Sequence, residues 1–356
     1  MARGTCLEID RKKITENSRR VLELCSSQGV EVLGVTKGFS AVPAIVEAIV
    51  SGGIESLADA RLENVIRLRE HGLHQYMTLL RIPMLSQVKK VVNFCQCSLN
   101  SELTVMKALS EAALACGKVH DVVLMIDVGD MREGVFPGDA AKIARQILTL
   151  KGIHLCGVGT NMGCYGGILP TKHNLNLLCE VAKELENIAG YPFSVVSGGG
   201  TSSLLLLERR EMPEGVNQLR VGEGILLGTD TTNNRDIPWL CQDAFVLKAE
   251  IVEIKSKPTV PYGERGYDAF GGTTEFVDNG IRKRAIVALG RQDVSLTGVT
   301  PFDPKIQVLG ASSDHMILDI EDMDQELRLG DQIPLKLNYR GLLRACTSRY
   351  IKQVFL

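Results

Sequence analysis

Short apolar runs alternate with longer amphipathic, charged stretches through the first two-thirds of the chain. Each run has the length of a β-strand, and the stretches between them, such as residues 43–50 and 175–188, have helical periodicity. A strand and a helix repeated about eight times predict an α/β fold, a TIM-type (β/α)8 barrel with its chemistry at the C-terminal strand ends. A doubly wound sheet is the structural alternative. The runs are residues 31–35, 54–58, 76–82, 93–99, 122–128, 153–158, 193–197 and 218–227.

The pattern changes after about residue 236. Here β-rich runs are separated by Pro and Gly and lack helical periodicity, which predicts a second, all-β domain. We expect residues 1–235 to form the barrel, residues 236–356 to form a C-terminal β domain, and residues 233–238 to link them.

Composition narrows the kinds of partner. The net charge of −2 and the interspersed charges provide no basic surface for nucleic acid or an anionic membrane. No apolar run approaches the roughly 20 residues that span a bilayer, and the N-terminus lacks the apolar region of a signal peptide. Ten cysteines without a CxxC pair indicate reduced thiols rather than disulfides or a zinc site. We therefore expect a cytoplasmic protein that binds a small molecule and no metal.

Polar residues follow the apolar runs directly, as a barrel with chemistry at its strand ends requires. Lys37 is the most informative of them, because it follows the run 31–35 in the segment EVLGVTKG. Lysine is rarely buried unless it is paired or chemically employed. Lys37 therefore either extends into solvent from a strand end or serves as a catalytic amine.

Two glycine-bearing segments follow the last two predicted strands. SGGGTSS comprises residues 197–203, and RVGEG comprises residues 220–224. Consecutive glycines let backbone N–H groups approach an anion, and barrels often bind phosphate in the loops after strands seven and eight. A phosphate site opposite a strand-end lysine suggests pyridoxal 5'-phosphate (PLP) as cofactor.

These segments resemble the alanine racemase family of PLP enzymes. VTKG, DVGDMREG, SGGGTSS and LRVGEG resemble motifs of its barrel, and GASSDHMILDI and NYRGLLRACTSRY are similar to motifs of its β domain, in the same order. LRIPM, NSEL, DAFG and GIRKRAI resemble the branch of the family that racemises ornithine. The resemblance implies PLP, a barrel with a β domain, and a homodimer in which the partner's β domain completes the active site.

The family's site residues carry over by position. Lys37 would form the Schiff base with PLP and act as one of two bases, and burial would lower its pKa. Arg132 matches an arginine that contacts the substrate carboxylate or the cofactor phenolate. Arg220 matches one that hydrogen-bonds the pyridine nitrogen and, because a guanidinium does not readily lose a proton, keeps that ring unprotonated. The other cofactor contacts that we predict are Asn161, in place of a histidine beside the ring, and Ser197, Gly200, Thr201, Ser202, Gly222, Glu223 and Tyr339.

The second base departs from the family pattern. Two-base racemisation needs a proton acceptor on each face of Cα. In ALGRQDV, Arg291 stands at the position of the family's second catalytic tyrosine and cannot be an ordinary base. We predict Asp314 and His315 of GASSDH as catalytic residues instead, although this segment could also be a turn with a structural histidine. The alternatives are Asp293, Tyr262 and Tyr267.

The predicted function is a PLP-dependent racemase that interconverts L- and D-ornithine by removing and returning the Cα proton. The distal ammonium of ornithine would need an acidic partner, because an unpaired buried charge is costly. The candidates are Asp268, Glu264, Asp293 and Glu223. The alternatives are an alanine or broad-specificity racemase, a lyase similar to D-threonine aldolases, and a PLP carrier without catalysis.

Overall fold

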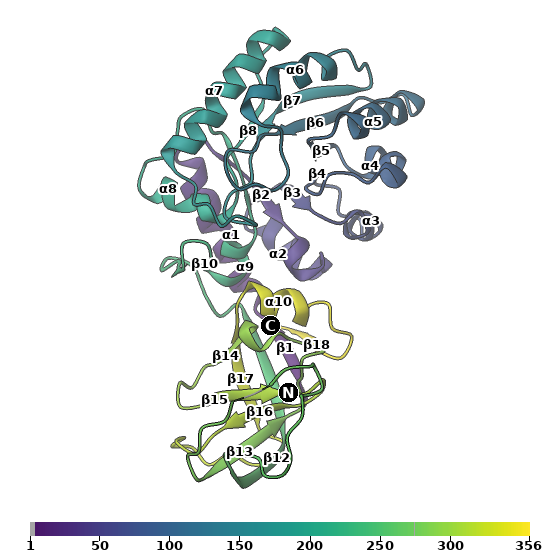
Figure 1. The fold of residues 1–356 in the computed structure, drawn as a ribbon. Helices are drawn as coiled ribbons and strands as arrows, with labels where there is room; N and C mark the ends of the chain where they lie inside the picture. Colours follow the sequence, from purple (N-terminus) through teal and green to yellow (C-terminus); the bar gives the residue numbers. More distant parts are fainter. Residues whose placement is uncertain (1–3, 274) are drawn as a thin grey trace. The chain divides into compact units, whose positions relative to one another are not determined.

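A computed structural model describes residues 4–273 and 275–356, which divide into two compact units (Figure 1). The barrel unit comprises residues 12–242, and the β unit comprises residues 4–11 and 243–356. The predicted fold class, a TIM-type barrel with a C-terminal all-β domain, is confirmed.

Eight parallel strands close into a barrel in chain order, and β2 pairs with β9 at the closure. The strands follow the predicted runs with two larger departures. The run 93–99 begins inside helix α4 (Val88–Phe94), and its strand starts only at Cys97. The run 218–227 leaves its strand after Val221 and continues into helix α9 (Glu223–Leu227). The strands are β2 Glu31–Val35, β3 Ser56–Asp59, β4 Tyr76–Leu79, β5 Cys97–Asn100, β6 His120–Met125, β7 Ile153–Gly159, β8 Val195–Ser197 and β9 Gln218–Val221.

Helices follow the strands and surround the barrel (Figure 1). They are α1 Arg11–Ser26, α2 Pro43–Ser51, α3 Leu62–Glu70, α4 Val88–Phe94, α5 Leu103–Ala115, α6 Pro137–Ile147, α7 Lys172–Ala189, α8 Leu204–Glu208 and α9 Glu223–Leu227, with 3-10 turns η1 Lys37–Phe39, η2 Leu85–Gln87 and η3 Thr201–Ser203. A short hairpin, β10 Thr229–Asp230 and β11 Arg235–Asp236, follows α9.

The strands are apolar over most of their length because both faces of the barrel sheet are covered. In β2, a Cβ at Gly34 would lie 3.0 Å from Ile49 of α2, so this face of the strand meets the helices. The alternation of side chains turns Leu33 and Val35 to the opposite face. There they pack with Ala58 in one cluster of the core.

The β unit is an antiparallel sheet in the order β14-β17-β12-β13-β16-β15. Its long strand β12 alternates buried and partly buried residues from Phe245 to Ile251, as a sheet with one face in the core requires. The elements are β12 Phe245–Pro258, β13 Ile281–Val287, η4 Leu296–Gly298, β14 Val299–Pro301, β15 Gln307–Ala311, β16 Met316–Asp319, β17 Gln332–Leu337, α10 Tyr339–Ala345 and β18 Lys352–Phe355.

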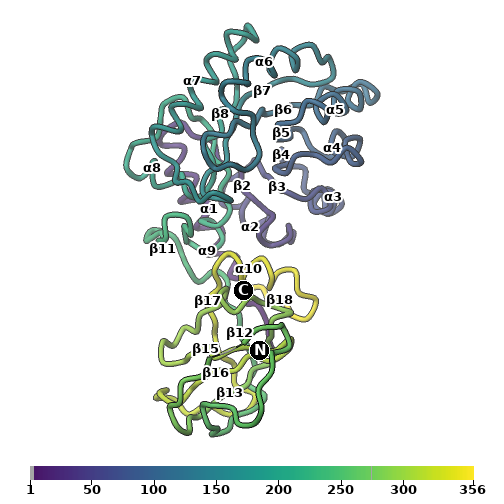
Figure 2. Tube along the Cα trace, viewed as in Figure 1, coloured from purple at the N-terminus to yellow at the C-terminus, as the bar shows by residue number. Residues whose placement is uncertain are grey.

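The N-terminal strand β1 (Cys6–Ile9) belongs to the β unit, whereas the sequence placed it with the barrel. It pairs antiparallel with β12 and parallel with β18, and Figure 2 shows both chain ends in this unit. Its buried Leu7 and Ile9 face the same core as β12. The barrel unit also continues to residue 242 rather than to residue 235, because the side chain of Asn17 in α1 hydrogen-bonds to the backbone N–H and carbonyl oxygen of Cys241.

Among the residues that the structure describes, none of the helices is both long and apolar enough to span a lipid bilayer.

Candidate active site

The C-terminal ends of the barrel strands bring polar side chains to one rim. Lys37 follows β2, and Arg220 lies in β9, which pairs with β2 where the barrel closes. The other strands contribute Asp59, Asn100, Arg132, Asn161 and Ser197 at or just after their ends. Because parallel strands of a barrel end on the same side, these residues belong to one site.

Lys37 lies partly buried among charged groups. Burial lowers the pKa of its amine, and the positive charges of Arg132 and Arg220 lower it further. Cys164 and Asp59 act on this pKa in the opposite direction. The environment therefore favours the uncharged amine, the form that can act as a nucleophile or as a base.

Arg132, Glu133, Asn161 and Arg220 form a continuous chain of polar contacts. Arg132 donates to both carboxylate oxygens of Glu133 through Nε and Nη2. Asn161 donates from Nδ2 to Glu133 Oε1 at 2.6 Å and accepts at Oδ1 from Arg220 Nη2 at 3.0 Å. Arg132 Nη1 also donates to Cys164 Sγ at 2.7 Å. The structure therefore brings three predicted residues, Arg132, Asn161 and Arg220, into one network.

Two aspartates hold the loops that present this network. Asp127 accepts the N–H groups of Gly129 at 2.9 Å and Met131 at 3.2 Å, and Met131 adopts a positive φ of 53° beside Arg132. The buried Asp130 accepts three N–H groups from the loop after β7, those of Cys164, Tyr165 and Ile168. The loops after β6 and β7 are thus tied together where Arg132 meets Cys164.

Arg220 is buried and donates to three oxygens: Ser197 Oγ, the carbonyl oxygen of Thr160 at 2.5 Å, and Asn161 Oδ1. Burial, with the charge of Arg132, lowers its pKa to about 10, and Glu133 opposes this shift. Arg220 therefore stays protonated at neutral pH. A guanidinium has five N–H groups, so two remain for a ligand acceptor.

The loops after β8 and β9 pack against each other. Gly224 donates its backbone N–H to Thr201 Oγ1 at 3.2 Å, which links η3 to α9. A Cβ at Gly222 would lie 3.1 Å from Val35 Cβ, and one at Gly200 would lie 2.9 Å from the carbonyl oxygen of Arg220. Glycine at these positions lets both loops lie directly against β2 and β9. Because the first N–H groups of a helix lack intrahelical partners, the starts of η3 and α9 can bind an anion.

Glu223 contributes to this rim through its backbone. Its partly buried carboxylate accepts from the side chains of Thr229 and Thr231, and burial raises its pKa. The side chain is thus turned toward β10, while the backbone N–H at the start of α9 remains a predicted phosphate contact.

Two buried oxygens at this end of the barrel have no hydrogen-bond partner within the described residues. They are Asn100 Oδ1 at the end of β5 and Thr160 Oγ1 after β7. Buried polar groups are generally hydrogen-bonded, so both oxygens indicate a ligand or ordered water at this rim.

Asp314, His315 and Tyr339 belong to the β unit. Asp314 and His315 are exposed in the hairpin turn between β15 and β16, and Tyr339 begins α10. The backbone N–H of Arg291 donates to the carbonyl oxygen of Ser312 at 2.9 Å, so Arg291 and the two predicted bases share one region. The roles of Asp314, His315 and Tyr339 stay predictions.

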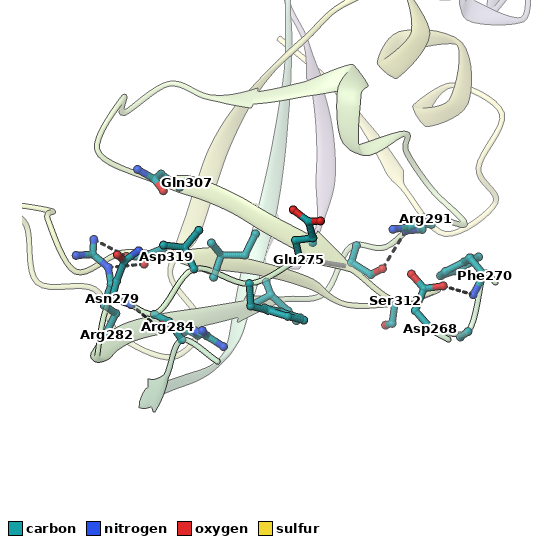
Figure 3. Close-up of a pocket in the computed structure, with 18 of the residues that line it drawn as sticks. Asp268, Phe270, Glu275, Asn279, Arg282, Arg284, Arg291, Gln307, Ser312 and Asp319 are labelled. Carbon is teal, nitrogen blue, oxygen red and sulfur yellow. Dashed lines mark hydrogen bonds and ion pairs between the residues drawn. The ribbon is translucent and has the colours of Figure 1, made fainter. Parts of the chain in front are cut away.

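A cavity of about 720 Å³ lies beside this hairpin turn, within the β unit (Figure 3). Arg291, Asp268 and Ser312 line one end, and the ion pair of Arg282 and Asp319 lies at the other. The guanidinium of Arg291 lies over the ring of Phe270, 4.4 Å from its centre, and donates from Nε to the carbonyl oxygen of Ala311. Arg291 is thus held by packing and hydrogen bonding rather than poised as a base.

The four acidic candidates for substrate recognition differ in how they are occupied. Asp293 is buried and accepts from Ser348 Oγ at 2.6 Å, and Glu223 is held by two threonines. Asp268 uses Oδ1 for the N–H groups of Phe270 and Gly272, which lowers its pKa and leaves Oδ2 outside those bonds. Glu264 is exposed. Asp268 is exposed as well, and all four residues stay predicted candidates for a distal ammonium.

Sequence reasoning missed Glu133 and Cys164. Glu133 follows Arg132 in DVGDMREG, so an acidic neighbour was visible, but its bidentate contact depends on the backbone turn at Met131. Cys164 lies 32 residues from Arg132, and no pattern in the sequence indicates the contact.

Across residues 4–273 and 275–356, no three His, Cys, Asp or Glu side chains gather as metal ligands would.

Known proteins match this chain over its whole length. The family model described as "Alanine racemase, N-terminal domain" matches residues 9–230. Lysine racemase from Thermotoga maritima is 42% identical over 98% of each chain. Ornithine racemase from Acetoanaerobium sticklandii is 41% identical over 98% of this chain and 99% of that one. The solved structure of alanine racemase from Streptomyces lavendulae shares the fold, with a TM-score of 0.79 and 17% sequence identity. The match covers 100% of this chain and 98% of that one.

Proposed function

The chain belongs to the alanine racemase family, and from this premise we propose that it racemises basic amino acids, with ornithine as its substrate and PLP as its cofactor. The observation that carries the proposal is Lys37, a partly buried amine just after β2, whose pKa is lowered by burial and by the charges of Arg132 and Arg220.

The residues at the barrel rim suit PLP. Lys37 offers an amine for the aldehyde, and the loops after β8 and β9 offer Thr201, Ser202, Gly222 and the start of α9 to the phosphate. Arg220 has N–H groups left for the pyridine nitrogen, and Ser197 and Asn161 hold it in place. When bound, PLP withdraws electrons from Cα of the attached amino acid and makes its proton removable.

Lys37 acts as one of the two bases in this proposal. An amine must be unprotonated before it accepts a proton, and a pKa nearer the working pH makes it a more effective base. Burial and the two guanidinium groups supply that condition at Nζ. Arg132, held by Glu133, is placed to bind the substrate carboxylate or the cofactor phenolate.

The second base comes from the β unit of a partner subunit. We infer a homodimer in which Asp314 and His315 reach Cα on the face opposite Lys37. Their position supports this role, since both residues are exposed in the hairpin turn. The proposal leaves Arg291 as a packed neighbour of that turn. Tyr339 remains our proposal for a further phosphate contact.

Ornithine and lysine are favoured over alanine because the two full-length relatives are named for them. Lysine is the second candidate on account of the Thermotoga maritima relative. A distal ammonium needs a carboxylate partner, and the exposed Asp268 and Glu264 are our candidates for it. We also propose a cytoplasmic location, which the ten free cysteines support.

Chiral chromatography of the purified protein with PLP and L-ornithine, L-lysine or L-alanine tests this function. We expect D-ornithine and D-lysine to form at least about 10-fold faster than D-alanine, and Lys37→Ala to lose at least about 100-fold in kcat/KM. Lys118→Ala, which changes an exposed lysine, should keep the wild-type rate. Faster turnover of alanine would overturn the substrate, and unchanged activity of Lys37→Ala would overturn the mechanism.

A further inference from the structure

Glu133 joins two parts of the site that the proposed function uses separately. Its carboxylate binds Arg132 through both oxygens and also accepts from Asn161 Nδ2 at 2.6 Å. Arg132 belongs to the loop after β6, and Asn161 belongs to the loop after β7. One side chain therefore fixes two cofactor-facing groups from neighbouring strands.

The amide of Asn161 transmits this constraint. It can donate only from Nδ2 and accept only at Oδ1. Because a carboxylate only accepts and a guanidinium only donates, Nδ2 must face Glu133 and Oδ1 must face Arg220, as the structure has them. Removing the negative charge of Glu133 would remove the reason for this orientation.

The charges of the site also indicate a role for Glu133. Arg132 and Arg220 both act on Lys37, and Arg132 also lowers the pKa of Arg220, whereas Glu133 raises it. The side chain of Glu133 is only 19% exposed, so water screens it poorly. Glu133 therefore offsets the repulsion between two guanidinium groups that would otherwise move apart.

We propose that Glu133 is a positioning residue, which holds Arg132 and Asn161 in their places around Lys37 and keeps Arg132 and Arg220 together. This inference rests on the proposed function. In this proposal Glu133 acts through its contacts with Arg132 and Asn161.

Glu133→Gln tests the proposal, because glutamine keeps the size of the side chain but places an N–H group against a guanidinium. A misplacement of about 1 Å can cost about 100-fold in rate, so we expect a loss of that order in kcat/KM for ornithine. PLP binding, measured by equilibrium dialysis without substrate, should weaken. The pH midpoint of PLP binding should shift downward, because the loss of a negative charge disfavours the ammonium form of Lys37. The other charged or titratable groups that act on Lys37 are Arg132, Arg220, Asp59 and Cys164.

Glu208→Gln is the matched control. Glu208 forms a bidentate pair with Arg235 at 2.7 and 2.8 Å, with side chains 22% and 19% exposed, and the site does not use it. If both ion pairs were merely structural, each variant should lose a similar amount of melting temperature. The affinity for PLP and the pH midpoint of PLP binding should then stay unchanged in both variants. Glu133→Asp keeps the charge but not the reach, so it should restore the pH midpoint and only part of kcat/KM.

The outcomes separate the two proposals. If the wild-type protein racemises ornithine but Glu133→Gln matches Glu208→Gln in PLP affinity, pH midpoint and kcat/KM, Glu133 has no positioning role. If the wild-type protein binds PLP but racemises no amino acid, the proposed function fails, and the effect of Glu133→Gln on PLP affinity still tests the positioning of Arg132.

Discussion

At the scale of single residues, Lys37 lowers the stability of the folded protein by an amount that depends on pH. Its pKa in the folded protein lies below its ordinary value near 10.5. Between these two values the unfolded chain binds more protons than the folded one, so stability rises as the pH rises. Folding of the PLP-free protein is therefore opposed most strongly at lower pH, where Lys37 must either stay charged among two guanidinium groups or lose its proton.

Replacing Lys37 by Met makes this cost measurable. In the PLP-free protein, Lys37→Met should raise the melting temperature near pH 7, and its advantage over the wild type should shrink as the pH approaches the ordinary pKa of lysine, about 10.4. Differential scanning calorimetry from pH 7 to 10 records both. A constant difference across this range would show that the pKa of Lys37 is not lowered.

How far the sequence predicted the site depends on the range of the contacts. Lys37 could be placed because it follows an apolar run, and Arg220 because it matches an arginine of the family in LRVGEG. Pairing of β2 with β9 then brings the two strands side by side. The hydrogen bond between Asn161 and Glu133 could not be predicted, because the two residues meet only through the loop geometry that Asp127 and Asp130 impose. The second base, predicted as Asp314 and His315, stays a prediction, since both lie in a different unit from Lys37.

At the scale of elements, the hydrogen bond from Gly224 N–H to Thr201 Oγ1 joins η3 to α9. Thr201→Val keeps the shape of the side chain and removes this acceptor. One hydrogen bond contributes about 1 kcal/mol, so PLP should bind about fivefold more weakly if the two loops form the phosphate site. Equilibrium dialysis measures the change.

Thr15→Val is a suitable control for this change. Thr15 donates to the carbonyl oxygen of Ala48 at 2.9 Å, between α1 and α2. The substitution therefore removes one hydrogen bond that lies outside the loops after β8 and β9. It should lower the melting temperature without affecting PLP affinity. If Thr201→Val and the wild type bind PLP with equal affinity, the hydrogen bond between Thr201 and Gly224 does not contribute to phosphate binding.

Element boundaries show the same limit of local patterns. The run 93–99 reads as one strand, yet Asn93 and Phe94 are the last residues of α4 and only Cys97 onward joins the barrel. Apolar runs of this length fit a buried helix end as well as a strand, and strand pairing decides between them. The β1 assignment failed for a related reason, since its partners β12 and β18 lie more than 200 residues away.

At the scale of the whole molecule, the first strand of the chain belongs to the core of the last unit. Leu7 of β1 is 0% exposed and lies opposite Leu247 of β12 and Gln353 of β18. Truncating a buried leucine leaves a cavity and removes its transfer free energy. Leu7→Ala should therefore lower the free energy of unfolding of the β unit by about 2–5 kcal/mol, although Leu7 lies far from residues 243–356 in sequence.

Two units need not unfold together, so the measurement must report on the β unit alone. Hydrogen exchange of the β12 and β17 amides followed by mass spectrometry does this, and Leu7→Ala should speed their exchange while the barrel strands β5 and β6 keep their protection. Ile281→Ala is the control, since Ile281 is 70% exposed at the start of β13 and its loss should change stability by less than about 0.5 kcal/mol. Unchanged exchange in β12 would mean that β1 does not stabilise this unit, and faster exchange in β5 and β6 would instead assign the N-terminal strand to the barrel.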